Sequence, residues 1–95
     1  MKISELKPGM GDVVLEAEVT SVEAPREVNR GGTPLRVANV TLRDDSGTIT
    51  LVLWNNDIER VQEGMFVKIE KAYVNTWQNK AQLTLGKFGK LTALA

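Results

Sequence analysis

Apolar and polar residues alternate along much of the chain, in short segments separated by turn-forming residues. In residues 13–22 the apolar side chains of Leu15, Ala17 and Val19 occupy every second position. Residues 35–43 and 48–54 repeat this alternation. Strict alternation is typical of a strand that has one face in a core and the other in solvent. The first half of the chain therefore predicts three half-buried strands.

Two further strands are predicted in the second half, in residues 65–74 and from Ala81 to Leu85. In the fourth strand the apolar positions change parity, from Val67 and Ile69 to Ala72 and Val74. Such a change requires an extra residue or a bend in the strand, so we expect a β-bulge between the two pairs.

The connections between these strands differ in kind. Residues 23–34 contain two prolines and a Gly-Gly pair and predict a long loop or a loose hairpin. Asp44-Asp45-Ser46-Gly47 predicts a tight turn. Residues 55–63 predict a short helix or turn that ends near Gly64. Residues 75–80 predict a turn before the last strand.

Five strands with a helical segment between the third and fourth are the layout of an OB-fold barrel. We therefore expect an all-β, five-stranded OB-fold that occupies residues 1–95 as one domain. Leu6 and its apolar neighbours near the N-terminus should pack under the barrel. Phe88, Leu91 and Leu94 are expected to close its other end.

Composition narrows the functional classes. The 95 residues are 42% hydrophobic and include no Cys and no His. The most common catalytic base, metal ligand and thiol nucleophile are therefore all missing, so we expect neither an enzyme nor a cofactor. No apolar run is long enough for a membrane span or a secretory signal. The expected location is cytoplasmic, without membrane association.

The formal net charge is zero, but the charges are unevenly distributed. Residues 24–43 and 68–95 carry an excess of Arg and Lys, whereas residues 1–23 and 44–67 carry an excess of Asp and Glu. If the fold brings the two basic segments together, a neutral protein acquires one positive surface.

Three of the five aromatic residues stand out by their position. Trp54, Tyr73 and Trp77 each fall on the parity opposite to the apolar positions of their own segment. Large aromatic rings on a polar face suggest a binding partner. Unpaired bases suit such rings, because each base has a π-face and stacking depends little on sequence. The alternative is that the rings pack against neighbouring strands or cover an end of the barrel.

Several cations accompany these aromatic residues, and we expect them to contact phosphates. The candidates are Arg26, Arg30, Arg36, Lys71 and Lys80, with Arg26 and Lys71 the strongest. The loops that hold them flank one groove in an OB-fold. Scattered surface cations are often simply solvated, so each of them alone is a weak signal. Five polar residues could also hydrogen-bond to base edges, although we expect most of them to be ordinary polar residues of a hairpin: Asn75, Thr76, Gln78, Asn79 and Gln82.

A set of motifs resembles the archaeal single-OB-fold single-stranded DNA-binding proteins, and is similar to the eukaryotic simple single-stranded DNA-binding proteins and the OB domains of replication protein A. The motifs are Leu51-Val52-Leu53-Trp54, Gly64-Met65-Phe66-Val67-Lys68-Ile69-Glu70, Ala72-Tyr73 with Trp77, and Gln82-Leu83 before Gly86. The likeness extends from about residue 3 to residue 87, and the order and spacing of the motifs make it moderately specific.

The resemblance implies sequence-independent binding of single-stranded DNA in replication and repair. It also implies that Trp54, Tyr73 and Trp77 stack on bases, with Arg26 as a basic residue of the first loop. Two alternatives stay open: an RNA- or tRNA-binding OB domain, and an OB module that binds protein through the same aromatic residues. We expect a monomer, although the sequence decides neither the oligomeric state nor any protein partner.

Overall fold

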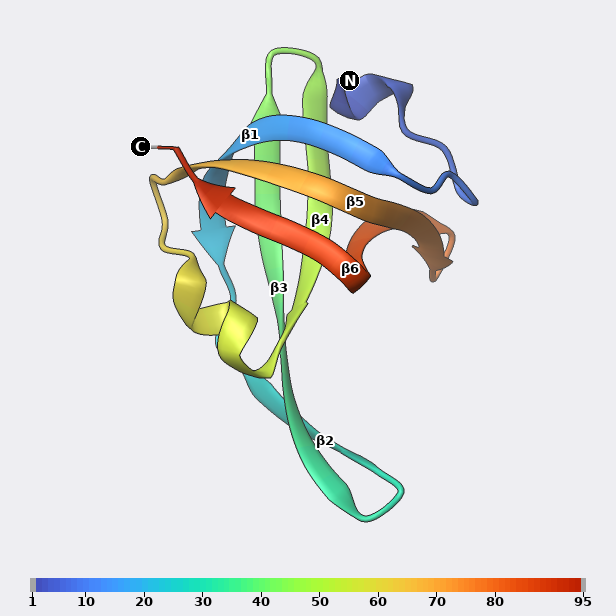
Figure 1. Ribbon diagram of the computed structural model, residues 1–95, viewed down its shortest axis with the longest axis vertical. Helices are drawn as coiled ribbons and strands as arrows, with labels where there is room; N and C mark the ends of the chain where they lie inside the picture. Colours follow the sequence, from blue (N-terminus) through green and yellow to red (C-terminus); the bar gives the residue numbers. More distant parts are fainter. Residues whose placement is uncertain (1, 95) are drawn as a thin grey trace.

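The computed structural model of the protein describes residues 2–94, apart from the side chains of residues 30, 56, 77 and 86–88. Strands dominate the part that is described (Figure 1). The strands are β1 (Val13–Val22), β2 (Arg26–Arg30), β3 (Thr33–Asp44), β4 (Gly47–Trp54), β5 (Phe66–Trp77) and β6 (Lys80–Ala93). Two 3-10 helices accompany them, η1 (Ile3–Glu5) and η2 (Asn55–Arg60).

Five of these strands form a closed barrel. Neighbouring strands pair in the order β1-β5-β6-β4-β3, and an additional β1–β3 pairing closes the ring. All pairs are antiparallel except β4 with β6. With η2 between β4 and β5, this is the five-stranded OB-fold that the sequence predicts.

β2 lies outside the ring and pairs only with the first half of β3. The two strands form a ribbon that projects from the barrel in Figure 1 and lies along the 40 Å long axis of the molecule. The turn consists of Gly31 and Gly32, which have φ angles of 57° and 82° that L-residues rarely adopt. Of the two predictions for residues 23–34, the hairpin is the correct one.

The predicted bulge in the fourth strand of the barrel is confirmed. The β5–β6 register shifts between Glu70 and Ala72, and Lys71 has a φ of +54°. The extra residue restores the inward direction of the apolar side chains, so both Ile69 and Ala72 are fully buried.

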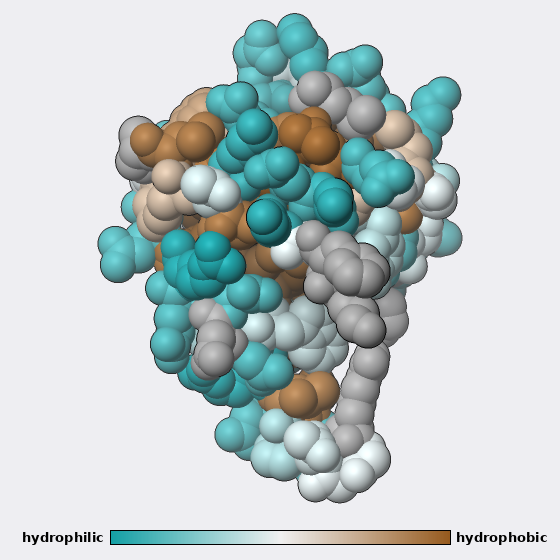
Figure 2. Space-filling model, in the orientation of Figure 1, coloured by the Kyte–Doolittle hydropathy of each residue, from teal (hydrophilic) through white to brown (hydrophobic). Residues whose placement is uncertain are grey.

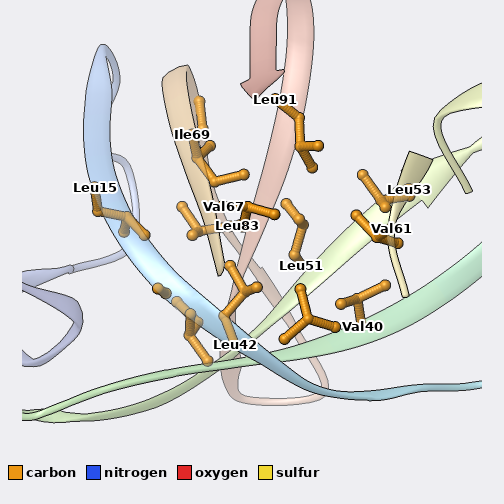
Figure 3. Packing of buried hydrophobic residues seen from close by; sticks show 14 of the residues in the cluster. Leu15, Val40, Leu42, Leu51, Leu53, Val61, Val67, Ile69, Leu83 and Leu91 are labelled. Carbon is orange, nitrogen blue, oxygen red and sulfur yellow. The ribbon is translucent and has the colours of Figure 1, made fainter. Parts of the chain in front are cut away.

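Buried aliphatic side chains fill the barrel (Figure 3). Each strand of the ring contributes, and Leu15, Leu42, Leu51, Ile69 and Leu83 are almost inaccessible to solvent. Burial of this kind stabilises the fold by about 1.5–3 kcal/mol per large aliphatic side chain. The core thereby fixes which side chains of each strand point outward.

One end of the barrel is closed by η2 and β6. Ile58 and Val61 are buried, and the Arg60 guanidinium donates a hydrogen bond to the Leu91 carbonyl. Leu91 is buried as predicted, but the prediction for Leu94 is wrong, because its side chain is 46% exposed. The Leu94 N–H donates to the Phe66 carbonyl, which leaves its side chain at the outer edge of β6. The side chain of Phe88 lies outside the described part.

The turn between β3 and β4 is held by one carboxylate. Asp44 Oδ1 accepts hydrogen bonds from Ser46 N, Ser46 Oγ and Gly47 N, as the turn motif predicts, while Oδ2 accepts from Ile3 N at 2.8 Å. Burial alone would raise the pKa of Asp44, but these hydrogen bonds outweigh it and lower the pKa from 3.8 to about 2. Asp44 thus ties the N-terminal turn to the barrel.

Candidate nucleic-acid interface

The strand register places outward side chains from four strands on one surface, which we call the aromatic face. It consists of Val37, Asn39, Thr41, Thr48, Thr50, Val52, Trp54, Tyr73, Asn75, Gln82 and Thr84. Each of these residues is next to a residue whose side chain is buried in the barrel, and Val37 and Thr84 are themselves covered by their neighbours. Residues directly opposite each other in neighbouring strands lie on the same side of a sheet, so the register defines rows across this face.

Trp54 and Tyr73 both belong to the aromatic face. Trp54 is half-buried and lies opposite Val37, whereas Tyr73 is 42% exposed and lies opposite Thr84. Thr84 in turn lies opposite Val52, two residues before Trp54 on β4. The two rings therefore stand on adjacent strand rows of one surface, and neither belongs to the barrel core.

The third aromatic residue ends β5. Trp77 pairs with Lys80 across a turn whose residues Gln78 and Asn79 have φ angles of 51° and 65°. Positive φ at both positions is typical of the type I′ turn, which gives the tightest hairpins. The backbone of Trp77 is two residues beyond Asn75, but its side chain lies outside the described part.

The ribbon separates the three arginines of the basic loop. Arg26 lies opposite Val37, which lies opposite Trp54, so its side chain is on the side of the aromatic face. Arg36 lies opposite Glu27 on the other side, where its guanidinium is 3.3 Å from the Glu59 carboxylate. The structure thus does not bring Arg36 to the aromatic face. Arg30 is at the tip of the ribbon, and its side chain lies outside the described part.

Lys71 and Lys80 border the aromatic face from the other side. Both side chains are exposed, Lys71 at the bulge and Lys80 at the start of β6. Within the described residues, Arg26, Lys71 and Lys80 form no ion pair, whereas Lys2, Arg36, Arg43 and Arg60 are each paired with a carboxylate. In the same part of the chain Lys7, Lys68 and Lys90 form no ion pair either, so the cations at the aromatic face are distinguished by their position and not by the lack of a partner.

No position of the aromatic face carries a carboxylate. Carboxylates and lysines occur together on a second surface, which we call the mixed-charge face. It lies where β1, the first half of β5 and the end of β6 meet. It consists of Val14, Glu16, Glu18, Phe66, Lys68, Glu70, Lys90, Thr92 and Leu94. Figure 2 views the molecule from the side of these strands and shows small hydrophobic areas among hydrophilic side chains. Carboxylates thus lie outside the aromatic face, with Glu18 at its border, opposite Arg43, which in turn lies opposite Thr48.

The sequence did not identify Thr41 and Thr50 as candidate contacts. Their outward parity was visible in the alternation, but their alignment with Gln82 and Asn75 was not. Only the pairing of strands distant in the sequence brings these residues together.

No group of three or more His, Cys, Asp or Glu side chains in residues 2–94 is arranged to hold a metal ion. None of the described helices is long and apolar enough to cross a membrane.

Residues 13–91 match the model of the family described as OB-fold nucleic acid binding domain, and the chain belongs to this family. The match covers the barrel from the start of β1 to Leu91, the last buried residue of β6. The chain is thus a nucleic-acid-binding OB-fold domain.

Individual relatives agree with this assignment. The single-stranded DNA binding protein Ssb of Saccharolobus solfataricus is 27% identical over 90 residues, which are 95% of this chain and 61% of that protein. The chain therefore spans less than two thirds of the length of this relative.

Two solved structures are also similar. A replication protein A heterotrimer bound to ssDNA matches with a TM-score of 0.82 and 25% identity, over 100% of this chain and 24% of that chain. The second OB-fold domain of replication protein A from Methanococcus maripaludis matches with a TM-score of 0.80 and 26% identity, over 99% of this chain and 93% of that chain. The resemblance to archaeal single-stranded DNA-binding proteins and to replication protein A is confirmed.

Proposed function

We propose that this domain binds single-stranded DNA without sequence specificity, as a passive component of replication and repair. The observation that carries the proposal is the aromatic face, where Trp54 and Tyr73 share an outward surface that holds no carboxylate. The relative that is named a single-stranded DNA binding protein and the similar heterotrimer bound to ssDNA support the choice of ligand.

Stacking supplies the main part of the affinity in this proposal. Bases stack on Trp54, Tyr73 and Trp77, each contributing about 1–3 kcal/mol, and because every base has a π-face the contribution depends little on sequence. A duplex cannot bind in this way, since its bases are already stacked on one another. The arrangement thus favours unpaired strands.

Phosphate contacts supply a smaller part. Arg26, Lys71 and Lys80 are exposed cations that border the aromatic face, and Arg30 extends this set toward the tip of the ribbon. Each phosphate contact on a single strand contributes about −0.7 to the slope of log K against log salt, so three contacts predict a slope of roughly −2. Arg36 is not included, because it faces Glu59.

The proposed role requires no catalysis and no cofactor. The chain contains neither His nor Cys, so the usual proton-transfer and thiol chemistry is missing. The family and the relative that match the chain are described by the binding of nucleic acid. We propose that the domain acts by covering single strands, as a monomer.

Titration with oligo-dT, oligo-U and duplex DNA at two salt concentrations tests the proposal, with tryptophan fluorescence as the readout. We expect strong quenching by oligo-dT, weaker quenching by oligo-U, none by duplex, and a shallow salt dependence. Equal affinity for oligo-U would replace the proposal with RNA binding. No response to any of the three would overturn it and favour a protein partner for the aromatic face.

A further inference from the structure

One row of the aromatic face consists entirely of uncharged hydrogen-bonding side chains. Thr41 lies opposite Thr50, Thr50 opposite Gln82, and Gln82 opposite Asn75. The row crosses β3, β4, β6 and β5 without interruption, and we call it the polar row. Thr41 and Thr50 each stand between two buried residues, and Asn75 and Gln82 are each next to one, Val74 and Leu83, so all four side chains point outward.

The polar row lies beside the aromatic residues. The neighbouring row runs from Asn39 through Val52 and Thr84 to Tyr73. The two rows lie about 7 Å apart, because they are separated by two residues along each strand. On β5, Asn75 stands between Tyr73 and Trp77. A base that stacks on Tyr73 therefore has its edge close to the polar row.

These four side chains are available for a ligand. None of them hydrogen-bonds to another protein group among the residues that the structure describes. Asn75 is exposed and the other three are half-buried. Thr41 and Thr50 also line a shallow hollow together with Lys80, a cation that could hold the adjoining phosphate.

The chemistry of the row determines what it can recognise. A hydroxyl and a carboxamide each donate and accept hydrogen bonds, and both can turn to exchange the two roles. Arg, Lys, Asp and Glu would each impose one role and so favour particular bases. A row without fixed donors or acceptors can therefore adapt to the edge of any base.

We infer that the polar row hydrogen-bonds to the Watson–Crick edges of the stacked bases and does so without selecting among them. This inference rests on the proposed function, because it requires bases on the aromatic face. It adds a second reason for preference of single strands: in a duplex the Watson–Crick edges are already paired. Stacking and edge contacts would then act on the same nucleotides.

Oligo-dT and an oligonucleotide of N3-methylthymidine separate edge contacts from stacking. The methyl group blocks the Watson–Crick edge but leaves the ring free to stack. We expect the wild-type protein to bind the methylated strand about two- to tenfold more weakly, as expected for one or a few lost hydrogen bonds. In the double variant Thr50→Val, Gln82→Leu the affinities for the two strands should be nearly equal.

Thr92→Val is the matched control, since Thr92 is exposed on the mixed-charge face. It should keep the wild-type ratio between the two strands. Far-UV circular dichroism and thermal unfolding verify that each variant is folded; if the double variant is not, Thr50→Val alone, which preserves the shape of the side chain, is compared in its place.

The outcomes are distinct. If the wild-type protein binds neither strand, the proposed function fails and the inference with it. If it binds both strands equally well, or if the double variant keeps the wild-type ratio, the inference is wrong and the proposed function stands. Parallel titrations with oligo-dC and oligo-dA test whether the polar row accepts all bases alike. The loss of affinity in the double variant should agree within about twofold for the three strands. A loss confined to one base would contradict the inference that the row does not select among bases.

Discussion

The aromatic face and the mixed-charge face belong to the same barrel but differ in how their polar groups are used. On the mixed-charge face, Glu16 lies opposite Lys68 and Glu70 opposite Lys90, and Glu18 forms a 2.7 Å ion pair with Arg43 at its border. Carboxylates and cations thus alternate across this face, and the only one of these residues in an ion pair within the described part of the chain is Glu18. On the aromatic face there are no carboxylates, and the bordering cations Arg26, Lys71 and Lys80 have no partner among the described residues.

This difference explains how a protein without net charge can bind a polyanion. Charges on the mixed-charge face add to the total but are screened over about 8–10 Å at physiological salt. A strand on the aromatic face encounters mainly the cations nearby and the rings. Net charge is therefore a poor guide here, and the local distribution decides.

Removal of one aromatic ring from the aromatic face should have the largest effect on the affinity for oligo-dT. We expect Trp54→Ala and Tyr73→Ala each to weaken binding of oligo-dT by about 1–3 kcal/mol, because each substitution removes one stacking platform. Fluorescence anisotropy of a labelled oligonucleotide measures the loss. Phe66→Ala, which removes a 41% exposed ring from the mixed-charge face, should leave the affinity unchanged.

Equal losses in all three variants would mean that the two faces do not differ in function. Because Trp54 lies opposite the buried Val37, its variant also needs a measurement of thermal unfolding. Tyr73→Ala provides the cleaner test, since the ring is 42% exposed.

Loss of the Asp44 carboxylate should affect stability alone. Asp44→Asn removes a charged group that accepts four hydrogen bonds. We expect the free energy of unfolding to fall by about 1 kcal/mol, which is less than the full pKa shift would give because solvent screens the charge. Urea unfolding at neutral pH measures it. Binding of oligo-dT should not change, because Asp44 lies at the β3–β4 turn and outside the aromatic face.

The same carboxylate predicts a pH dependence. The pKa of Asp44 is lower in the folded state, about 2, than the ordinary value of 3.8. Its contribution to stability is therefore complete above the ordinary value and is lost as the pH falls toward the folded value. The difference in stability between wild type and Asp44→Asn should shrink over this interval; a constant difference would contradict the assigned role.

A matched pair of charge removals should have the smallest effect. Arg26→Gln and Lys90→Gln change the net charge equally, but only Arg26 borders the aromatic face. We expect Arg26→Gln to weaken binding about two- to fivefold and to reduce the salt slope by about 0.7, as expected for one lost phosphate contact. Lys90→Gln should leave the slope unchanged. The same reduction in both variants would indicate that net charge, not position, governs binding.

Much of the fold followed from local pattern. The alternation around Leu15, Val40 and Leu51 predicted strands and their buried sides, and the change of parity after Ile69 predicted the bulge. The outward direction of Trp54 and Tyr73 followed in the same way. These features depend on neighbours one or two residues away, because side chains of a strand alternate between its two faces.

The features that depend on pairing over long distances did not follow from the pattern. Tertiary structure decided that β6 continues to Ala93 and that Leu94 stays exposed. It also decided that Arg26 and Arg36 lie on opposite sides of one ribbon, and that Thr41, Thr50, Gln82 and Asn75 form one row. The sequence alone determined which side chains leave the core, since parity is local. Only the register between distant strands determined which of them stand together, because a shift of one residue would turn each side chain to the other face.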